Sequence, residues 1–384
     1  MKIDFYRHGL SASDAAAVAN VLASPFLTTG RVAKGVEGQL SEYFAVPYAI
    51  LVNSWTNGAL ALLLALELKP GDEIIVPAMT FVATANVVVL SGGTPVFVDV
   101  NPSTLLLTPE AVTAAITPRT RAIIPVHLYG QMCDVKALRR AIDARTGDGR
   151  HVLIIEDCAH CFEGQFNGEK PGRQSDAAIF SFYATKNVTC GEGGAIITRN
   201  RDLYERTLET RLHGMSASAL ERFTGGHYNH WDMARIGTKA NLPDLLAALL
   251  PRQIATIDAR LPQRQALAAA YRQALGGGPL RLVEQVPNCS TAEHLFTVGV
   301  PKGKRDDAIA ALNQAGIGVT VNYRSVPDLT YYRSRSAGAG DRCPNARRWG
   351  EETLSLPLFP GLTEAEQTYV IRTVQALVYP IVSS

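Results

Sequence analysis

The chain has 384 residues, a net charge of +2, an apolar fraction of 47% and a charged fraction of 19%. These values indicate a soluble globular protein with one large domain and a smaller one. The near-neutral charge gives no electrostatic reason to expect nucleic acid or an anionic membrane as a partner. The first residues lack the apolar run of a signal peptide, and no run is long enough to cross a membrane. We therefore expect a cytoplasmic protein.

Six cysteines are spread along the chain, at positions 133, 158, 161, 190, 289 and 343. Cys158 and Cys161 have the CxxC spacing of a redox or zinc half-site, but no second pair follows to complete such a site. We therefore expect small packing residues in a reducing compartment, with neither a metal site nor disulfide bonds.

Between residues 48 and 199, short apolar runs alternate with amphipathic stretches. The predicted strands are 48–53, 73–78, 94–100, 121–130, 151–158, 176–183 and 194–199. The predicted helices are 57–68, 81–93 and 134–145. This alternation predicts an α/β fold, with a mostly parallel sheet flanked by helices on both faces. Such sheets bind their ligands at the carboxyl ends of the strands.

Beyond residue 200 the pattern changes and helices dominate. The longest predicted helix covers 242–275 and ends at the Gly-rich break 276–279. The segments that follow are predicted as a strand (294–300), a helix (304–316), a strand (318–324), a helix leading into a strand or loop (343–360) and a final helix (363–378). This order predicts a small α+β domain. We place the boundary so that residues 1–254 form the large domain and 255–384 the small one.

One lysine stands out in the segment FSFYATKN, residues 180–187. Lys186 follows Phe180, Phe182 and Tyr183, and no charged residue comes after it until Glu192. A lysine in apolar surroundings loses solvation of its ammonium form, so its pKa falls and its amine becomes a usable nucleophile. Alternatively, the side chain extends from a strand end to reach water.

Three other strand ends carry groups that suit a ligand. Ser54 and Thr56 stand where a helix begins, a place that favours an anion such as phosphate, although Ser and Thr are also ordinary helix caps. Asp157 follows an apolar strand, and a carboxylate there needs a cationic partner such as a metal or a protonated ring nitrogen. Phe81 begins a helix, where it either covers a flat ring or packs in the core.

Two further residues lie close to these groups in the sequence. His160 follows Asp157 by three positions, and it either reaches the same ligand or is a loop histidine bonded to backbone. Ser181 precedes Lys186 at the end of its strand. One ligand accounts for the whole set: pyridoxal 5′-phosphate (PLP) carries a phosphate, a flat ring, a ring nitrogen that needs an acidic partner, and an aldehyde that needs a lysine.

Six motifs occur in an order that matches one known family. They are FLTTG (26–30), the run from PGDEIIVPAMTF to VFVDV (70–100), VHLYGQ (126–131), EDCAHCFEG (156–164), FSFYATKN with CGEGG (180–194) and RLHG (211–214). In these motifs the chain resembles the DegT/DnrJ/EryC1/StrS family of sugar aminotransferases, a branch of the fold-type I PLP enzymes. The resemblance runs nearly from end to end.

The resemblance implies a role for each candidate residue. Lys186 would bond to the cofactor aldehyde and later move protons, Asp157 would pair with the pyridinium nitrogen, and His160 would lie near the phenolic oxygen. Phe81 would stack on the ring. The phosphate would be held by Ser54, Thr56, Ser181 and the backbone N–H of Trp55.

The resemblance also implies a homodimer with active sites at the interface. In the family, a segment of the partner subunit closes the phosphate site, and here that segment corresponds to 237–249, which contains Lys239. Lys239 would add a charge-assisted bond to phosphate from across the interface. Two segments depart from the common pattern: 322–329 replaces a stretch that often carries a histidine, and 227–233 is expected to shape the sugar or nucleotide pocket.

The resemblance implies an aminotransferase that converts a nucleotide-linked keto-sugar to an amino sugar, with pyridoxamine 5′-phosphate as the intermediate form of the cofactor. By family frequency we expect L-glutamate as the amino donor and C4 of a 4-keto-6-deoxy sugar as the acceptor. Sugar dehydratases on the same scaffold have histidine in place of the lysine, so Lys186 argues against that reaction. A non-catalytic, cofactor-binding regulator is a further alternative, although the sequence has no DNA-binding motif or basic stripe.

Overall fold

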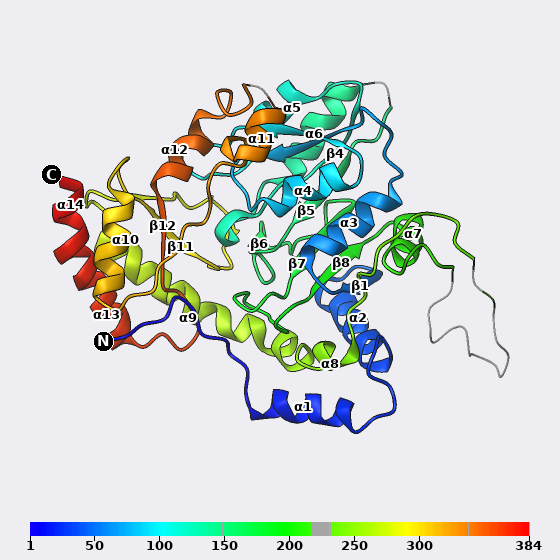
Figure 1. The fold of residues 1–384 in the computed structure, drawn as a ribbon, viewed down its shortest axis with the longest axis horizontal. Helices are drawn as coiled ribbons and strands as arrows, with labels where there is room; N and C mark the ends of the chain where they lie inside the picture. The colour runs from blue at the N-terminus through cyan, green and yellow to red at the C-terminus, as the bar shows by residue number, and fades with distance from the viewer. Residues whose placement is uncertain (148, 217–229, 231, 337, 384) are drawn as a thin grey trace.

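Figure 1 shows the chain as a central sheet surrounded by helices, with a second, smaller group of strands and helices at one end. The structure is a computed structural model, and it describes residues 1–147, 149–216, 230, 232–336 and 338–383. Much of the segment 227–233, which the sequence singled out as pocket-forming, lies outside the described residues. None of the described helices is long and apolar enough to cross a membrane.

The central sheet has seven strands in the order β1-β8-β7-β5-β4-β2-β3. Within it β8 runs antiparallel to both of its neighbours, while β7, β5, β4, β2 and β3 pair in parallel. The strands are β1 (Tyr48–Val52), β2 (Glu73–Pro77), β3 (Thr94–Val98), β4 (Thr120–Ile123), β5 (Leu153–Asp157), β7 (Ala177–Ser181) and β8 (Gly194–Thr198). The predicted α/β class and mostly parallel sheet are therefore confirmed.

Apolar cores cover both faces of this sheet. Alternate residues of one strand point to opposite faces, and on β1 Ile50 belongs to one buried cluster while Leu51 belongs to the other. Because both faces are buried, the strands are nearly continuous apolar runs. The helices of this part are α1 (Ala12–Leu22), α2 (Arg31–Phe44), α3 (Trp55–Ala65), α4 (Ala83–Leu90), α5 (Pro109–Ala115), α6 (Val135–Thr146) and α7 (Arg201–Thr210).

The smaller group is built on a three-stranded antiparallel sheet, β12-β11-β9. Its elements are β9 (Arg281–Leu282), β11 (Phe296–Gly299), β12 (Thr353–Leu356), α10 (Arg305–Gln314), α13 (Glu364–Thr373) and α14 (Tyr379–Ser383). The helices α11 (Thr330–Arg335) and α12 (Pro344–Glu352) instead pack through Tyr332 and Trp349 in a core cluster of the central sheet. The N-terminal end of the chain lies against this group, where Ile3 pairs with Ile317 (Figure 1).

The helix α9 (Pro251–Leu275) runs across the predicted domain boundary. Its first part packs in a core of the large sheet through Ile254 and Ile257, and its last part packs in the core of the smaller group through Tyr271 and Leu275. The division after residue 254 stays a prediction.

Three predicted elements differ from the structure because of proline or of pairing partners. The helix predicted over 242–275 is two helices, α8 (Asp244–Ala247) and α9, because Pro251 has no N–H to continue α8 and starts a new helix instead. The strand predicted over 121–130 ends at Ile123, and Leu128–Gly130 form a 3-10 turn. The strand predicted over 318–324 is wrong: within this segment one residue, Thr320, pairs in an isolated bridge with Ser355.

One close approach fixes where α3 begins relative to the sheet. Gly194, the first residue of β8, leaves no room for a side chain, since a Cβ there would lie 2.6 Å from the carbonyl oxygen of Phe180 and 2.9 Å from the backbone nitrogen of Trp55. The strand and the first turn of α3 therefore touch through their backbones.

We predict that Gly194→Ala lowers the free energy of unfolding by about 1–3 kcal/mol, because backbone atoms on two elements must move apart. The measurement is urea unfolding followed by circular dichroism. The matched control is Gly35→Ala in α2, where a Cβ meets nothing within 4 Å and alanine should stabilise the helix by about 0.5–1 kcal/mol. Equal stabilities of the two variants would contradict the prediction.

Candidate active site

A cavity of about 630 Å³ opens at the carboxyl ends of the parallel strands. The residues after β1, β2, β5 and β7 all face it, as expected for this type of sheet. Eight residues singled out in the sequence line this cavity: Ser54, Trp55, Thr56, Phe81, Asp157, His160, Ser181 and Lys186. The structure therefore brings together side chains that are up to 132 positions apart, from Ser54 to Lys186 (186 − 54).

The start of α3 provides one end of the cavity. Ser54 is the N-cap of this helix, and its Oγ accepts a hydrogen bond from the backbone N–H of Asn57 at 3.1 Å. The ordinary capping role is therefore present, and the N-terminal end of the helix dipole is directed at the same space. Ser181 ends β7 opposite Gly194, close to this helix start. The indole of Trp55 is buried in the core, so only its backbone is available to a ligand.

Asp157 ends β5 as a buried carboxylate, with an exposed fraction of 4%. Its two oxygens accept hydrogen bonds from the Thr84 hydroxyl at 3.0 Å and from the Ala159 N–H at 3.1 Å. Burial raises the pKa of Asp157 to about 6, even though these donors and the positive charge of Lys186 act in the opposite direction. A cation in the cavity would restore the ionised form.

Lys186 follows β7 and reaches the same cavity. Burial lowers the pKa of its amine to about 8, and the Asp157 carboxylate opposes this fall. The direction agrees with the sequence expectation for a lysine in apolar surroundings. The Nζ of Lys186 lies 3.4 Å from Nε2 of His294. A pKa of about 8 leaves roughly a tenth of this amine unprotonated at pH 7, far more than for an ordinary lysine, and the unprotonated form is the one that attacks a carbonyl.

His160 is bonded to backbone and also faces the cavity. Its Nδ1 accepts from the N–H of Tyr129 at 3.2 Å, so its Nε2 bears the hydrogen and donates to the hydroxyl of Tyr323 at 2.9 Å. Burial, together with Lys186 and His294, holds the pKa of His160 well below its usual range, so the ring is neutral. Tyr323 in turn lies 5.4 Å, centroid to centroid, from the ring of Phe81, which is 55% exposed.

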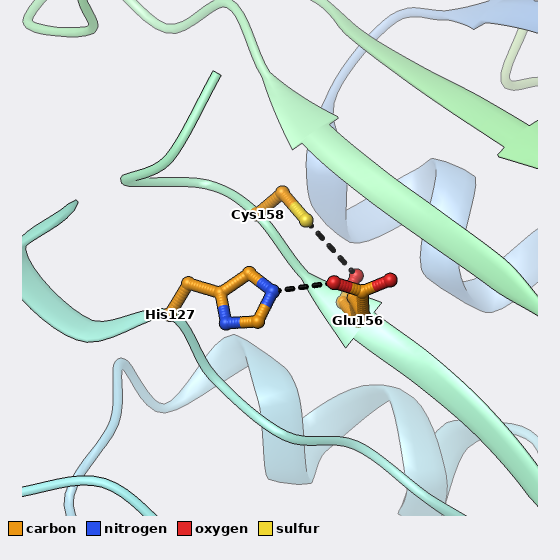
Figure 2. Close-up of side chains that lie close together, drawn as sticks. All are labelled: His127, Glu156 and Cys158. Carbon is orange, nitrogen blue, oxygen red and sulfur yellow. Dashed lines mark hydrogen bonds and ion pairs between the residues drawn. The ribbon is translucent and has the colours of Figure 1, made fainter. Parts of the chain in front are cut away.

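Behind Asp157, the neighbouring Glu156 points into the protein and forms a brace with His127 (Figure 2). His127 Nε2 lies 2.6 Å from Glu156 Oε2, while its Nδ1 accepts from the Cys133 N–H at 3.1 Å. Cys158 lies beside this pair, and burial raises the pKa of its thiol well above the usual range. These groups satisfy one another, so we assign them a structural role in fixing the end of β5. Cys158 and Cys161 are free and buried, and their role as packing residues stays a prediction.

The comparisons with known proteins match this geometry. A profile described as the DegT/DnrJ/EryC1/StrS aminotransferase family matches residues 9–375. The chain belongs to this family. The structure of S. venezuelae DesV in complex with a ketimine intermediate is similar, with 33% identity, coverage of 98% of each chain and a TM-score of 0.87.

Two further solved structures place this family member among enzymes described for sugars. Spr1654 from Streptococcus pneumoniae, described as a candidate sugar aminotransferase and solved in its PMP form, is 29% identical, with 99% of this chain and 100% of that chain covered and a TM-score of 0.91. The sugar aminotransferase CalS13 from Micromonospora echinospora is 28% identical, with coverage of 97% and 99% and a TM-score of 0.87. Spr1654 was also solved in a PLP form. The cofactor predicted from the sequence is therefore confirmed at the level of the family.

Lys239 does not line the cavity of its own chain in the part of the structure that is described. Its side chain is exposed, and its backbone oxygen accepts from Nδ2 of Asn53 at 3.1 Å. The loop of this DegT/DnrJ/EryC1/StrS family member thus runs beside the end of β1 and presents Lys239 outward. A role across a dimer interface stays a prediction.

Sequence reasoning missed several residues of the site. Thr84 bonds to Asp157, His294 contacts Lys186, and Tyr323 bonds to His160. Phe5 and Tyr6 also line the cavity, although they are far in the sequence from its other lining residues, which begin at Ser54. Thr84 lies within a quoted family motif and could have been proposed as a donor. His294 opens the apolar run HLFTVGV, and a polar residue at that place was the only available signal.

We predict that Asp157→Asn makes the cofactor-free protein more stable at pH 8, by about 1–3 kcal/mol. The folded-state pKa of about 6 lies above the ordinary value of 3.8, so folding binds the proton and ionisation costs stability as pH rises between these values. The advantage of the variant should therefore shrink by about half at pH 5.

The measurement is urea unfolding of both proteins at pH 5 and pH 8. Asp202→Asn on α7 is the matched control, because the Asp202 side chain is 70% exposed and its replacement should change the free energy of unfolding by no more than about 0.5 kcal/mol. An Asp157→Asn effect that is equal at both pH values would contradict the raised pKa.

Proposed function

We propose that this family member is a PLP-dependent aminotransferase that converts a nucleotide-linked keto-sugar to an amino sugar. One observation carries the proposal: the carboxylate of Asp157 and the amine of Lys186 face one cavity from the ends of adjacent parallel strands. Asp157 is buried and Lys186 is partly buried, and each shifts the pKa of the other. Perturbed groups that converge in a cavity are the usual mark of a catalytic site.

The residues present fit the four chemically distinct parts of PLP. Ser54, Thr56 and Ser181 offer hydroxyls near a helix N-terminus for the phosphate. Asp157 has no cationic hydrogen-bond partner among the described residues, so a pyridinium nitrogen would supply one. The ring of Phe81 is exposed at the cavity wall, where it would cover a flat face.

When bound, PLP supplies an aldehyde and a ring that withdraws electrons from the reacting carbon. Asp157 keeps a proton on the ring nitrogen, because the neutral carboxyl that burial favours becomes a carboxylate beside a cation. Lys186 presents an amine that takes up and returns a proton at Nζ with a pKa near neutral pH. His160 donates its Nε2–H to the hydroxyl of Tyr323, which lines the same cavity.

The sugar specificity is supported by the relatives and by the cavity wall. CalS13 is described as a sugar aminotransferase and Spr1654 as a candidate sugar aminotransferase. A cavity of about 630 Å³ is large enough for a cofactor with room for substrate. Exposed aromatic rings of Tyr6, Phe81 and Tyr183 line it, and such rings suit the faces of a sugar or a nucleobase. From the resemblance we propose L-glutamate as the donor, C4 of a 4-keto-6-deoxy sugar as the acceptor, and the cytoplasm as the compartment.

The dehydratase alternative is not favoured by any feature of the site. Two histidines, His160 and His294, lie near Lys186, but neither takes its place after β7. The lysine itself is directed into the cavity. An aminotransferase therefore accounts best for the residues present.

We predict that the purified protein, loaded with PLP, forms 2-oxoglutarate from L-glutamate and an amino sugar from a nucleotide-linked 4-keto-6-deoxyhexose. Glutamate alone should remove the visible absorbance of the cofactor. Lys186→Ala should reduce turnover by at least about 10³-fold, because the variant lacks both nucleophile and proton carrier. Mass spectrometry of the sugar product is the measurement.

The matched control is Lys170→Ala, which removes another partly buried lysine whose pKa is also lowered by burial but which pairs with Asp258 outside the cavity. This variant should turn over normally. If Lys186→Ala retains normal turnover, the assignment of the reactive lysine is wrong. If the wild type aminates keto-sugars only at another carbon, the enzyme class stands and the C4 proposal fails.

We further predict that Lys239 acts in the partner's active site of a homodimer. The variants Lys186→Ala and Lys239→Ala should each be strongly impaired, because one lacks the amine and the other the cation at the phosphate. Mixed under conditions that exchange subunits, they form dimers with one doubly defective site and one intact site. Activity should then return to up to about half the wild-type level per mixed dimer.

No recovery on mixing would show that both lysines of a site come from one chain. A fully active Lys239→Ala protein would remove the phosphate role before any mixing. Size-exclusion chromatography with light scattering, done on each variant, establishes that both remain dimers.

A further inference from the structure

The amine of Lys186 has a hydrogen-bonding neighbour that comes from the other part of the fold. His294 lies two residues before β11 of the three-stranded sheet, whereas Lys186 follows β7 of the central sheet. His294 Nε2 and Lys186 Nζ are 3.4 Å apart, and the His294 side chain is buried, with the residue 5% exposed. The contact therefore joins the smaller group of elements to the proposed reactive group.

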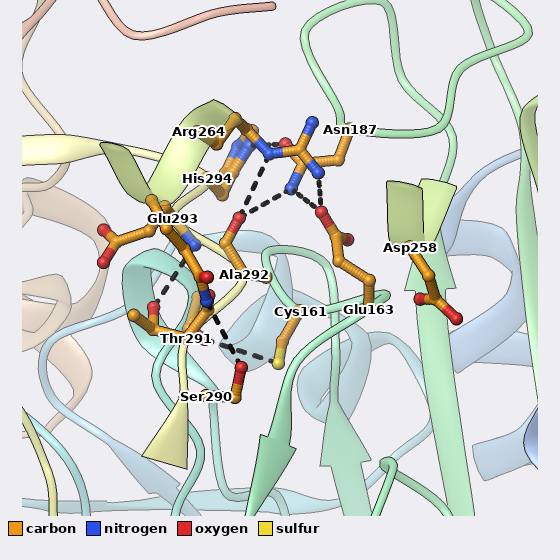
Figure 3. A network of polar contacts seen from close by, with 12 residues as sticks. Cys161, Glu163, Asn187, Asp258, Arg264, Ser290, Thr291, Ala292, Glu293 and His294 are labelled. Carbon is orange, nitrogen blue, oxygen red and sulfur yellow. Dashed lines mark hydrogen bonds and ion pairs between the residues drawn. The ribbon is translucent and has the colours of Figure 1, made fainter. Parts of the chain in front are cut away.

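The orientation of one amide, that of Asn187, sets the chemistry of this contact (Figure 3). Asn187 Nδ2 donates to Glu163 Oε1 at 2.9 Å and to the carbonyl oxygen of Ala292 at 3.1 Å. Both partners are acceptors, since Glu163 is ion-paired with Arg264 and so carries a carboxylate. The amide oxygen of Asn187 must then face the other way, toward His294.

This orientation decides which nitrogen of His294 bears the hydrogen. Oδ1 of Asn187 lies 3.1 Å from Nδ1 of His294, and an amide oxygen can only accept, so Nδ1 carries the hydrogen. Burial, Lys186 and Arg264 all lower the pKa of His294 well below its usual range, so the ring is neutral. Its Nε2 therefore carries a lone pair, and that lone pair is directed at Lys186.

The contacts behind His294 lie in the interior of the protein. Glu163 and Arg264 have exposed fractions of 0% and 1%. Arg264 also donates from Nε to the Ala292 oxygen at 3.3 Å, so the ion pair and the amide share one acceptor (Figure 3). Neither Glu163 nor Arg264 can change its side-chain conformation without leaving the other as an unpaired buried charge. The tautomer of His294 is thus fixed from a distance.

The other histidine of the cavity has the opposite tautomer. His160 accepts at Nδ1 from Tyr129 and bears its hydrogen on Nε2, and its ring centroid is 4.6 Å from that of His294. At Nε2, His160 is therefore a donor, bonded to Tyr323, whereas His294 is an acceptor. The groups that face His294 and can carry charge are Lys186, His160 and Arg264.

We infer that His294 is a positioning residue for Lys186: its Nε2 lone pair holds the amine whenever that amine is free, with Asn187 and Glu163 fixing the tautomer that allows this. The inference rests on the proposed role of Lys186. An aminotransferase frees its lysine in each half-reaction, and the free amine must then keep a proton close to the reacting carbon. An acceptor favours the ammonium form and confines it to one place.

The test is the titration of Lys186 in the full-length protein without cofactor. Trace labelling with acetic anhydride over a range of pH, read by mass spectrometry of the Lys186 peptide, gives the midpoint, expected at about 8. His294→Asn can still contact Asn187 but is too short to reach Lys186. Its midpoint should fall by about one pH unit, because a charge-assisted hydrogen bond is lost.

His294→Gln is the matched variant, since its longer amide reaches the position of Nε2 and its oxygen can accept from the ammonium group. Its midpoint should stay near the wild-type value. A merely structural role would move both variants alike, and an unchanged midpoint in His294→Asn would overturn the inference. A midpoint that rises in His294→Asn would show that Nε2 donates, which also overturns it.

A second measurement keeps the inference testable if a variant fails to fold. Nitrogen-15 NMR of the wild-type protein labelled at histidine distinguishes the two tautomers. The expected result is an Nδ1-protonated ring for His294 and an Nε2-protonated ring for His160, each assigned from the signal missing in its Gln variant. An Nε2-protonated His294 would overturn the inference. Neither measurement involves turnover, so failure here is distinct from failure of Lys186→Ala to lose activity.

Discussion

The carboxylate of Asp157 and the ammonium group of Lys186 are both desolvated at one edge of the sheet. The other residues of the site offset part of the free energy that this desolvation costs. Burial is the largest influence on both Asp157 and Lys186, and it acts on each against the charged form. The Thr84 hydroxyl and the Ala159 N–H offset part of the cost for the carboxylate. Both groups therefore titrate close to neutral pH, where a proton can move at little expense.

Asp157 and Lys186 stay desolvated only if the surrounding residues are held in place, because a mobile site would admit water to the charges. The brace of His127 and Glu156 lies behind the end of β5, and the ion pair of Glu163 with Arg264 lies behind the segment after β7. Both pairs are buried, so each is costly to break by removing one partner. The residues that line the cavity are thus held in place by two buried pairs that do not line it.

Much of the fold and site could be predicted because the signals are local. Apolar runs with turn residues between them located every strand of the central sheet, and parallel strands necessarily bring their carboxyl ends to one edge. Ser54, Asp157 and Lys186 were predictable for that reason, since each lies at the end of a strand or within five residues after it. The family motifs then supplied a common ligand for groups that the pattern alone left ambiguous.

The missed elements depend on contacts that the local sequence does not carry. The helix α2 contains Gly35 and Gly38, which lower helix propensity, yet Val36, Leu40 and Phe44 bury one face of it. Tertiary packing decides its structure. A strand needs a paired strand along its length, and in the segment 318–324 one residue, Thr320, forms a single bridge with Ser355.

The same limit applies to the site, where His294 is 108 positions from Lys186 and joins it only through the fold. No spacing rule along the chain relates two residues that meet through separate sheets. The orientation of Asn187, which sets the tautomer, depends in turn on Glu163 and Ala292. Such a network can be read only after the chain has folded.

The proline within α9 has a mechanical consequence. Pro262 has no N–H to bond to the carbonyl of Asp258, so the helix that is shared by both cores is weakest in bending near its middle. A rotation of the three-stranded sheet relative to the central sheet would bend α9 at Pro262, two residues before Arg264. The weak point of the helix lies next to Arg264, which pairs with Glu163 behind Asn187 and His294, so such a motion would shift His294 relative to Lys186.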